Sequence, residues 1–262
     1  MDLQLTTKTA LITGSTAGIG LAIAQRLAAE GANVILTGRT EARITAAKAA
    51  IVAQTPAARV RGVAVDFGDA AQVDNLLREV PTVDILINNV GIFEPKPFAE
   101  ITDADWLRFF EVNVLSGVRL SRQYFPLMLK QDAGRIIFIS SESGLQIPAE
   151  MVHYGTTKTA QLAVARGLAE LTKGTGVTVN SVLPGPTSSE GVEEFLKQLA
   201  GEGKSRAEAE HEFFRDARPS SLLQRFITPD EIATTVAYLC SPLAAATNGA
   251  SVRVDGGVVR SI

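Results

Sequence analysis

Short apolar runs alternate with longer Ala- and Leu-rich segments along most of the chain. The short runs often end in Gly, Asn or Ser, which is typical of buried strands followed by turns. We expect strands at Lys8–Thr13, Asn33–Thr37, Val60–Val65, Asp84–Ile87, Arg135–Ser140, Val177–Val182 and Ser251–Val254. We expect helices from the first turn to Glu30, where Gly31 follows, over Glu41–Gln54, over Thr102–Lys130 as one or two helices, and over Val152–Lys173 and Pro229–Cys240.

A glycine-rich turn, Thr13-Gly14-Ser15-Thr16-Ala17-Gly18-Ile19-Gly20, joins the first strand to the first helix. Strand, glycine-rich turn, helix and strand form the first half of a dinucleotide-binding unit, in which phosphate approaches the backbone at the positive end of a helix. We expect cofactor contacts from Gly14, Ser15, Gly18, Ile19 and Gly20. The spacing differs from the usual Gly-x-Gly-x-x-Gly, so an ordinary tight turn stays open.

The regular alternation of strands and helices predicts the fold class. It favours a parallel sheet with helices on both faces, so we predict an α/β fold with a single-domain, Rossmann-type doubly wound parallel sheet of about seven strands. The chain has 262 residues, 46% of them hydrophobic, which suits one domain with a sizeable core. We see neither a composition break nor an internal repeat, and we expect residues 1–262 to form one domain.

The end of the second strand predicts the choice of cofactor. An acidic residue there binds the ribose of NAD, whereas a nearby Arg accommodates the phosphate of NADP. The sequence is Gly38-Arg39-Thr40, and the forked guanidinium of Arg39 suits a phosphate, so we expect NADP(H) to be favoured over NAD(H). The alternative, in which Arg39 is solvated and stacks loosely over the adenine, stays open.

Asp66, after the third strand, is expected at the adenine edge, with a helix N-cap as the alternative.

Tyr154 and Lys158 are the candidate proton-transfer pair. Residues four apart lie on one face of a helix, and a nearby ammonium lowers the pKa of a phenol. The pair therefore suits proton exchange with a carbonyl or alcohol, although the spacing also occurs by chance. Ser141 follows a buried strand, and ligands of such folds bind beyond the carboxyl ends of strands. We expect Ser141 to face the same crevice as Tyr154.

Three further segments are expected near this crevice. Asn88-Asn89-Val90-Gly91 follows the fourth strand, where Asn and Gly allow a close backbone approach. Asn113 lies in an apolar helical segment and needs partners if buried; a structural Asn that fills a helix irregularity is the alternative. The polar stretch 188–226 after Pro184-Gly185-Pro186-Thr187 is expected to be a substrate lid, with a solvated surface insertion as the alternative.

Composition narrows the classes of partner. The net charge is −3, so we expect no nucleic-acid partner. Neither a signal peptide nor a membrane span is expected. Cys240 is the one cysteine and His153 and His211 are the two histidines, so we expect no disulfide framework and no zinc-type metal site. We expect a cytoplasmic protein.

Glu142 and His153 lie beside the candidate site, and we expect neither to contact substrate.

Taken together, these motifs resemble the short-chain dehydrogenase/reductase family along the whole chain. The turn Gly14-x-x-x-Gly18-Ile19-Gly20 is similar to the family's cofactor turn, and Asn88-Asn89-Val90-Gly91 to its Asn-Asn-Ala-Gly motif, with Val90 in place of Ala. Tyr154-x-x-x-Lys158, with Ser141 thirteen residues before Tyr154, is similar to its active site. Asn113 matches the family's fourth catalytic residue. Pro184-Gly185 matches the family's turn at the nicotinamide, and Thr187 matches the hydroxyl residue that follows this turn.

The resemblance implies roles for these residues. Tyr154 acts as general acid or base, Ser141 holds the substrate oxygen, Lys158 lowers the pKa of Tyr154 and binds the nicotinamide ribose, and Asn113 holds a water. The implied catalytic residues are Asn113, Ser141, Tyr154 and Lys158. The expected cofactor-binding residues are Gly14, Ser15, Gly18, Ile19, Gly20, Arg39, Asp66, Asn89, Gly91, Tyr154, Lys158, Pro184, Gly185 and Thr187.

The resemblance also implies an activity and an assembly. We expect an NAD(P)(H)-dependent oxidoreductase, foremost an NADPH-dependent reductase of a ketone, an aldehyde or a 3-oxoacyl group. An NAD-dependent alcohol, sugar or steroid dehydrogenase is the alternative, and a non-catalytic nucleotide-sensing protein is a remote one. A small-molecule carbonyl or alcohol is the expected substrate. Members of this family are commonly homotetramers, so we expect a homo-oligomer, either a tetramer or a dimer.

Overall fold

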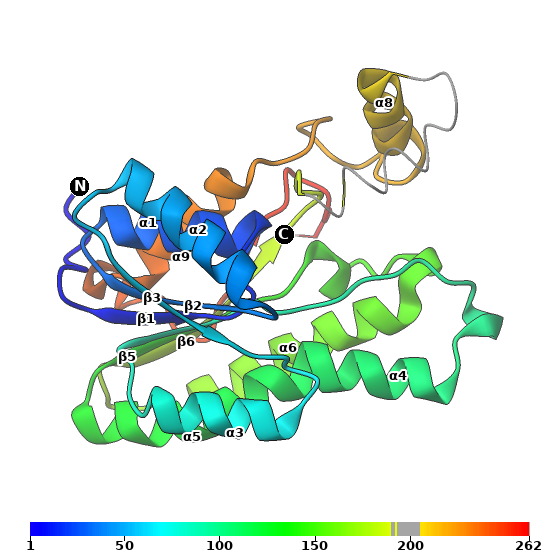
Figure 1. Ribbon diagram of the computed structural model, residues 1–262. Coiled ribbons are helices and arrows are strands. Elements are labelled where there is room, and N and C mark those ends of the chain that lie inside the picture. Colours follow the sequence, from blue (N-terminus) through cyan, green and yellow to red (C-terminus); the bar gives the residue numbers. More distant parts are fainter. Residues whose placement is uncertain (190–191, 193–204, 262) are drawn as a thin grey trace.

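The computed structural model describes residues 1–189, 192 and 205–261 (Figure 1). This part of the chain contains a seven-stranded sheet in the order β3-β2-β1-β4-β5-β6-β7, in which every neighbouring pair is parallel. The strands are β1 Thr9–Ile12, β2 Asn33–Gly38, β3 Arg59–Ala64, β4 Ile85–Asn88, β5 Gly134–Ile139, β6 Val177–Pro184 and β7 Ser251–Val254. The predicted α/β class and parallel sheet are confirmed.

Helices cover both faces of the sheet (Figure 1). They are α1 Gly18–Ala29, α2 Glu41–Gln54, α3 Ala70–Glu79, α4 Asp103–Phe110, α5 Ser116–Gln131, α6 Val152–Glu170, α8 Arg206–Asp216 and α9 Pro229–Cys240. Helices α4, α8 and α9 each begin with a capping box, in which a Ser or Thr side chain and an acidic side chain three residues later satisfy backbone N–H groups. Thr228 is the N-cap of α9, directly before Pro229 at the first helical position.

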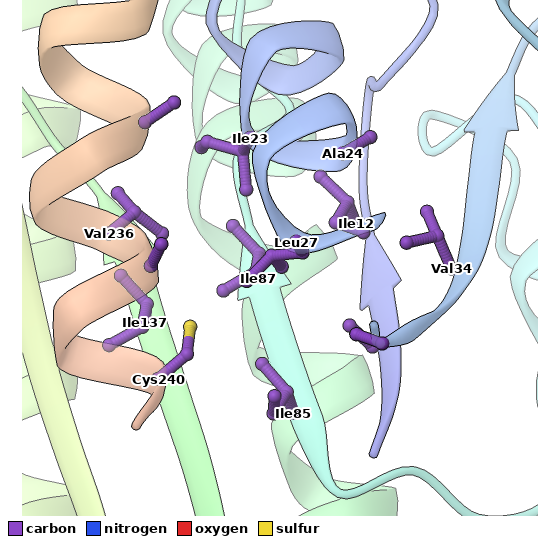
Figure 2. Packing of buried hydrophobic residues seen from close by; sticks show 14 of the residues in the cluster. Ile12, Ile23, Ala24, Leu27, Val34, Ile85, Ile87, Ile137, Val236 and Cys240 are labelled. Atoms are coloured by element: carbon purple, nitrogen blue, oxygen red, sulfur yellow. The ribbon is translucent and has the colours of Figure 1, made fainter. Parts of the chain in front are cut away.

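Two apolar cores hold the layers together, one on each face. Successive strand residues point to opposite faces, so Ile85 and Ile87 of β4 enter one core and Leu86 enters the other. Figure 2 shows the first core, in which Ile23 and Leu27 of α1 pack with Val236 and Cys240 of α9. Residues of α3, α5 and α6 build the second core. Strands buried on both faces explain why the apolar runs in the sequence are nearly continuous.

The segment between α4 and α5 is a π-helix, Glu111–Leu115, and Asn113 lies within it. The chain therefore continues from α4 to α5 without a break in direction but with one wider turn. Such turns are rare and often lie at functional sites. The expected helix Thr102–Lys130 is two α-helices joined by this irregularity, and the alternative for Asn113, a structural Asn in a helix irregularity, describes its position correctly.

The structure excludes the alternative in which Asp66 is a helix N-cap. Asp66 does not cap the following helix, because the N-cap of α3 is Asp69, whose carboxylate accepts from the N–H groups of Ala71 and Gln72. Within the predicted lid, Arg206–Asp216 form α8, whereas residues 190–191 and 193–204 lie outside the described part. No helix of the described residues is long and apolar enough to cross a membrane.

Hydrogen bonds join the turn after β1 to the turn after β4. The Asn89 side-chain amide donates to the carbonyl oxygens of Thr13 (2.8 Å) and Gly14 (3.1 Å), and the Asn89 N–H donates to the Thr13 hydroxyl (2.8 Å). A Cβ atom on Gly20 would lie 2.4 Å from the Gly14 carbonyl oxygen and 2.6 Å from the Asn89 amide nitrogen. Glycine is therefore required at position 20 by this close approach.

We predict that Gly20→Ala lowers the free energy of unfolding by about 1–3 kcal/mol, because the methyl group forces the two turns apart. Chemical denaturation measures this change. Gly167→Ala on α6 is the matched control, since its Cβ would meet no heavy atom within 4 Å, and it should stabilise the helix by about 0.5–1 kcal/mol. Equal stability of Gly20→Ala and the wild type would contradict the packing described here.

Candidate active site

A cavity of about 530 Å³ opens at the carboxyl ends of the strands. Its walls come from segments far apart in the sequence: Ile19 of α1, Asn89 and Gly91 after β4, Ser141 and Glu142 after β5, Tyr154 and Lys158 of α6, Gly185 and Thr187 after β6, and Phe213 and Arg218 of the 205–226 segment. The structure therefore brings Ser141, Tyr154 and Lys158 to one cavity. Because all strands are parallel, their carboxyl ends meet at this edge.

Lys158 is held at the base of the cavity. Its ammonium nitrogen donates to the Ile139 carbonyl oxygen (3.0 Å) and to the Gln161 side-chain oxygen (3.2 Å), and the residue is 4% exposed. The same nitrogen lies 5.7 Å from the centre of the Tyr154 ring. Burial lowers the pKa of Lys158 to about 8, a fall that the Glu142 carboxylate opposes. Lys158 is thus still mainly protonated at neutral pH.

Asn113 organises the same region from the π-helix. Its side-chain oxygen accepts from the Ile92 N–H (2.7 Å), and its amide nitrogen donates to the Ile92 carbonyl oxygen and to the Thr157 hydroxyl (both 3.0 Å). The Asn113 backbone carbonyl accepts from the Gln161 amide (2.5 Å). Asn113 therefore links the loop after β4 to α6, and its side chain is occupied by protein partners. The side-chain oxygen accepts one hydrogen bond and keeps a second lone pair, so the water implied by the resemblance stays a prediction.

Ser141 is bonded to its neighbour in the chain. Its hydroxyl donates to a carboxylate oxygen of Glu142 and accepts from the Ser143 N–H (3.1 Å). The other Glu142 oxygen accepts from the Arg218 guanidinium (3.1 Å). Glu142 lines the cavity and is 4% exposed. Glu142 therefore contacts a candidate catalytic residue, and our expectation that it does not contact substrate stays a prediction.

The Tyr154 phenol lies in an environment that keeps it protonated. Burial raises its pKa above the ordinary range and the Glu142 carboxylate adds to the rise, while the hydrogen bond with Ser141 and the charge of Arg218 oppose it. This direction is opposite to the one expected from Lys158 alone, because desolvation of the phenolate outweighs the nearby ammonium. Tyr154 in this cavity is therefore a proton donor at neutral pH.

The start of α1 fits a bound phosphate group. Its N-cap residue, Ala17, makes no side-chain cap within the described part of the chain, and its first turn carries no acidic residue, so the first N–H groups of the helix are not neutralised. Gly14 and Gly18 have φ values of +60° and +54°, which glycine adopts without strain. Ser15 differs, because it is fully buried and its hydroxyl bonds Ile12 and Thr37 within the turn.

Arg39 and Asp66 lie at the adjacent strand ends. Arg39 follows β2 and is exposed, and within the described residues no ion pair or hydrogen bond holds its guanidinium. Asp66 is exposed as well, and its carboxylate accepts from the Gly68 N–H (2.9 Å). Both side chains can thus reach a ligand that lies along the carboxyl edge of the sheet. These residues, with the free helix start, fit an adenine dinucleotide.

The turn after β6 closes the far side of the cavity. A Cβ atom on Gly185 would lie 2.5 Å from the Asp255 carbonyl oxygen, and the Gly185 N–H donates to Val254 (3.0 Å). Thr187 is buried and its hydroxyl donates to the Gly185 carbonyl oxygen (2.8 Å). Pro184, Gly185 and Thr187 therefore form a tightly packed part of the cavity wall.

Three residues of the site were missed in the sequence. Thr157 and Gln161 lie three and seven positions after Tyr154, on the helix face that carries Lys158, and this spacing would have identified them. Arg218 had no signal, since its partners Glu142 and Glu150 are far away in the chain. His153 is fully buried against Phe109, at a ring-centre distance of 4.0 Å, in agreement with our expectation that it is structural.

Comparison with known proteins identifies the family. The profile described as short chain dehydrogenase matches residues 8–200. The chain is 50% identical to an uncharacterized oxidoreductase, YvaG, of Bacillus subtilis (strain 168), over 100% of both chains. It is 35% identical to a D-beta-hydroxybutyrate dehydrogenase of Cupriavidus necator, over 98% of this chain and 99% of the relative.

A solved structure agrees with this match. L-sorbose reductase from Gluconobacter frateurii, complexed with NADPH and L-sorbose, has a TM-score of 0.93 and 30% identity, with 100% of both chains covered. The chain therefore belongs to the short-chain dehydrogenase/reductase family and is an NAD(P)-dependent oxidoreductase that acts on alcohol or carbonyl groups.

Proposed function

We propose that this enzyme is an NADPH-dependent reductase of a ketone, an aldehyde or a 3-oxoacyl group. The observation that carries the proposal is the single cavity that holds Ser141, Tyr154 and Lys158 beside the glycine-rich turn. A protonated Tyr154 suits the direction from carbonyl to alcohol, because the general acid must enter the reaction with its proton. The L-sorbose reductase structure contains NADPH, which supports the same cofactor here.

The proposed reaction divides the work between cofactor and protein. When bound, the reduced nicotinamide supplies the hydride that adds to the carbonyl carbon. Tyr154 gives its proton to the carbonyl oxygen, so that one O–H bond breaks as another forms, and the phenolate regains a proton from solvent. Ser141 holds the substrate oxygen, and Lys158 stabilises the phenolate and binds the nicotinamide ribose. Asn113 holds Ile92 and Thr157 in place around them.

We propose that Gly14, Gly18, Ile19 and Gly20 hold the pyrophosphate with the start of α1. Arg39 takes the phosphate of NADP, Asp66 lies at the adenine, and Asn89, Gly91, Pro184, Gly185 and Thr187 surround the nicotinamide. Ser15 contributes by shaping the turn. The guanidinium of Arg39 is exposed and has no ion pair or hydrogen bond with any residue that the structure describes, which supports the preference for NADP.

We also propose that the 205–226 segment acts as the lid of a single catalytic domain. Phe213, Ala217, Arg218 and Phe226 line the cavity, so this segment contributes part of the cavity wall. The family resemblance supports a cytoplasmic homo-oligomer, a tetramer or a dimer. An NAD-dependent alcohol, sugar or steroid dehydrogenase is the second candidate, and the match to a hydroxybutyrate dehydrogenase favours it.

We predict that Tyr154→Phe lowers kcat at least about 100-fold, because it removes the general acid, and leaves the dissociation constant for NADPH within about threefold of the wild type. Steady-state turnover and nucleotide titration measure the two quantities. Tyr238→Phe is the control, since that ring is 42% exposed and lies outside the cavity. Turnover of Tyr154→Phe near the wild-type rate would refute the assignment of the acid.

We predict that Arg39→Ala raises KM for NADPH at least about tenfold and changes KM for NADH by less than about twofold. Loss of a charge-assisted contact to the phosphate costs more than about 1.4 kcal/mol, which corresponds to that factor. Arg43→Ala, on the first turn of α2, is the charge-matched control. Equal effects of Arg39→Ala on the two cofactors would place the phosphate elsewhere and favour the second candidate.

A further inference from the structure

A buried ion pair lies directly behind the candidate catalytic Ser141. The Arg218 Nε donates to one Glu142 oxygen at 3.1 Å, and the two side chains are only 10% and 6% exposed. Arg218 also donates to Glu150 (3.3 Å) and to the Ala217 carbonyl oxygen (2.8 Å). The pair joins the short 3-10 helix after β5, Glu142–Gly144, to the segment that follows α8, and both residues line the cavity.

This ion pair determines how Ser141 can use its hydroxyl. An ionised carboxylate can only accept hydrogen bonds, so the contact between Ser141 and Glu142 requires Ser141 to be the donor. The Ser143 N–H occupies one lone pair of the same oxygen. The second lone pair of Ser141 is left for its hydrogen bond with the Tyr154 phenol, and the Ser141 hydrogen becomes available to a carbonyl oxygen only when it turns away from Glu142.

The same two charges act on Tyr154 in opposite directions. Glu142 disfavours the phenolate and raises the Tyr154 pKa, whereas Arg218 favours the phenolate and lowers it. The charged groups that line this cavity, within the described residues, are Glu142, Glu150, Lys158 and Arg218. Among these four groups, Glu142 is the one that hydrogen-bonds the Ser141 hydroxyl, and Glu150 shares its partner Arg218 but is half-exposed.

We propose that Glu142, clamped by Arg218, is a positioning residue that orients the Ser141 hydroxyl, and that the balance of the two charges sets the pH range in which Tyr154 exchanges its proton. This inference rests on the proposed function only in that Tyr154 is the proton-transfer group. It gives a function to two charges whose burial is otherwise costly, since a buried ion pair adds little to stability on average.

The test compares three charge-removing variants in the alcohol-oxidation direction, where Tyr154 must be ionised and the rate rises with pH. Glu142→Gln should move this rising limb of kcat/KM to lower pH by about one pH unit, because the like charge beside the phenolate is removed. Arg218→Gln should move it to higher pH, because the opposite charge is removed. Glu150→Gln removes a carboxylate from the same Arg218 and should leave the limb in place.

The opposite signs separate this proposal from a merely structural role. General damage to the cavity would lower the rates of both variants without moving the two limbs in opposite directions. Arg218→Gln leaves the Glu142 carboxylate buried without its partner. If this single variant does not fold, the double variant Glu142→Gln with Arg218→Gln replaces it. The limb of that double variant should lie at higher pH than the limb of Glu142→Gln alone.

A second measurement makes the result independent of turnover. The chain has three tyrosines, and ring-carbon NMR of labelled protein, with Tyr154→Phe to assign the signal, reports when Tyr154 ionises. The onset should come at the lowest pH in Glu142→Gln, at a higher pH in the wild type, and highest in Arg218→Gln. Limbs that do not move, or an NMR onset at the same pH in all three proteins, overturn the inference; a wild type that keeps the predicted NMR order but neither reduces a carbonyl nor oxidises an alcohol overturns the proposed function alone.

Discussion

All seven described strands run in the same direction, and the position of the site depends on this constraint. A parallel sheet needs a helix between successive strands, so both faces are covered and only the strand ends remain for binding. The carboxyl ends of β1, β4, β5 and β6 therefore place the glycine-rich turn, Gly91, Ser141 and Gly185 around one cavity. Each of these groups lies on a loop, and each loop directly follows a strand that is packed into the two apolar cores.

Burial then gives the site its chemistry. Lys158 is held by Ile139 and Gln161, Gln161 is held by Asn113, and Asn113 is held by Ile92 and Thr157. This chain of hydrogen bonds compensates the free-energy cost of removing these polar groups from water. The same desolvation lowers the pKa of Lys158 and raises that of Tyr154, so Tyr154 keeps the proton that its proposed role as general acid requires.

The local pattern of the sequence predicted most of the fold and the site positions, but not the partners of the charged groups. Apolar runs located the strands, and Ser141, Tyr154 and Lys158 do share a cavity, because spacing along a helix and position after a strand are local properties. Arg218 could not be predicted, since its pairing with Glu142 joins residues 76 positions apart. The direction of the Tyr154 pKa was missed for a related reason, because burial depends on the packing of the whole cavity.

The most direct test of the central claim is to follow the hydride itself. Purified protein is incubated with NADPH that carries deuterium at the transferable position, and with ketones, aldehydes and 3-oxoacyl thioesters in turn. We predict that one carbonyl class yields an alcohol with deuterium on the former carbonyl carbon, and that Tyr154→Phe yields none. Tight binding of NADPH with no deuterium in any product, and no oxidation of alcohols with NAD⁺ or NADP⁺, would contradict the account.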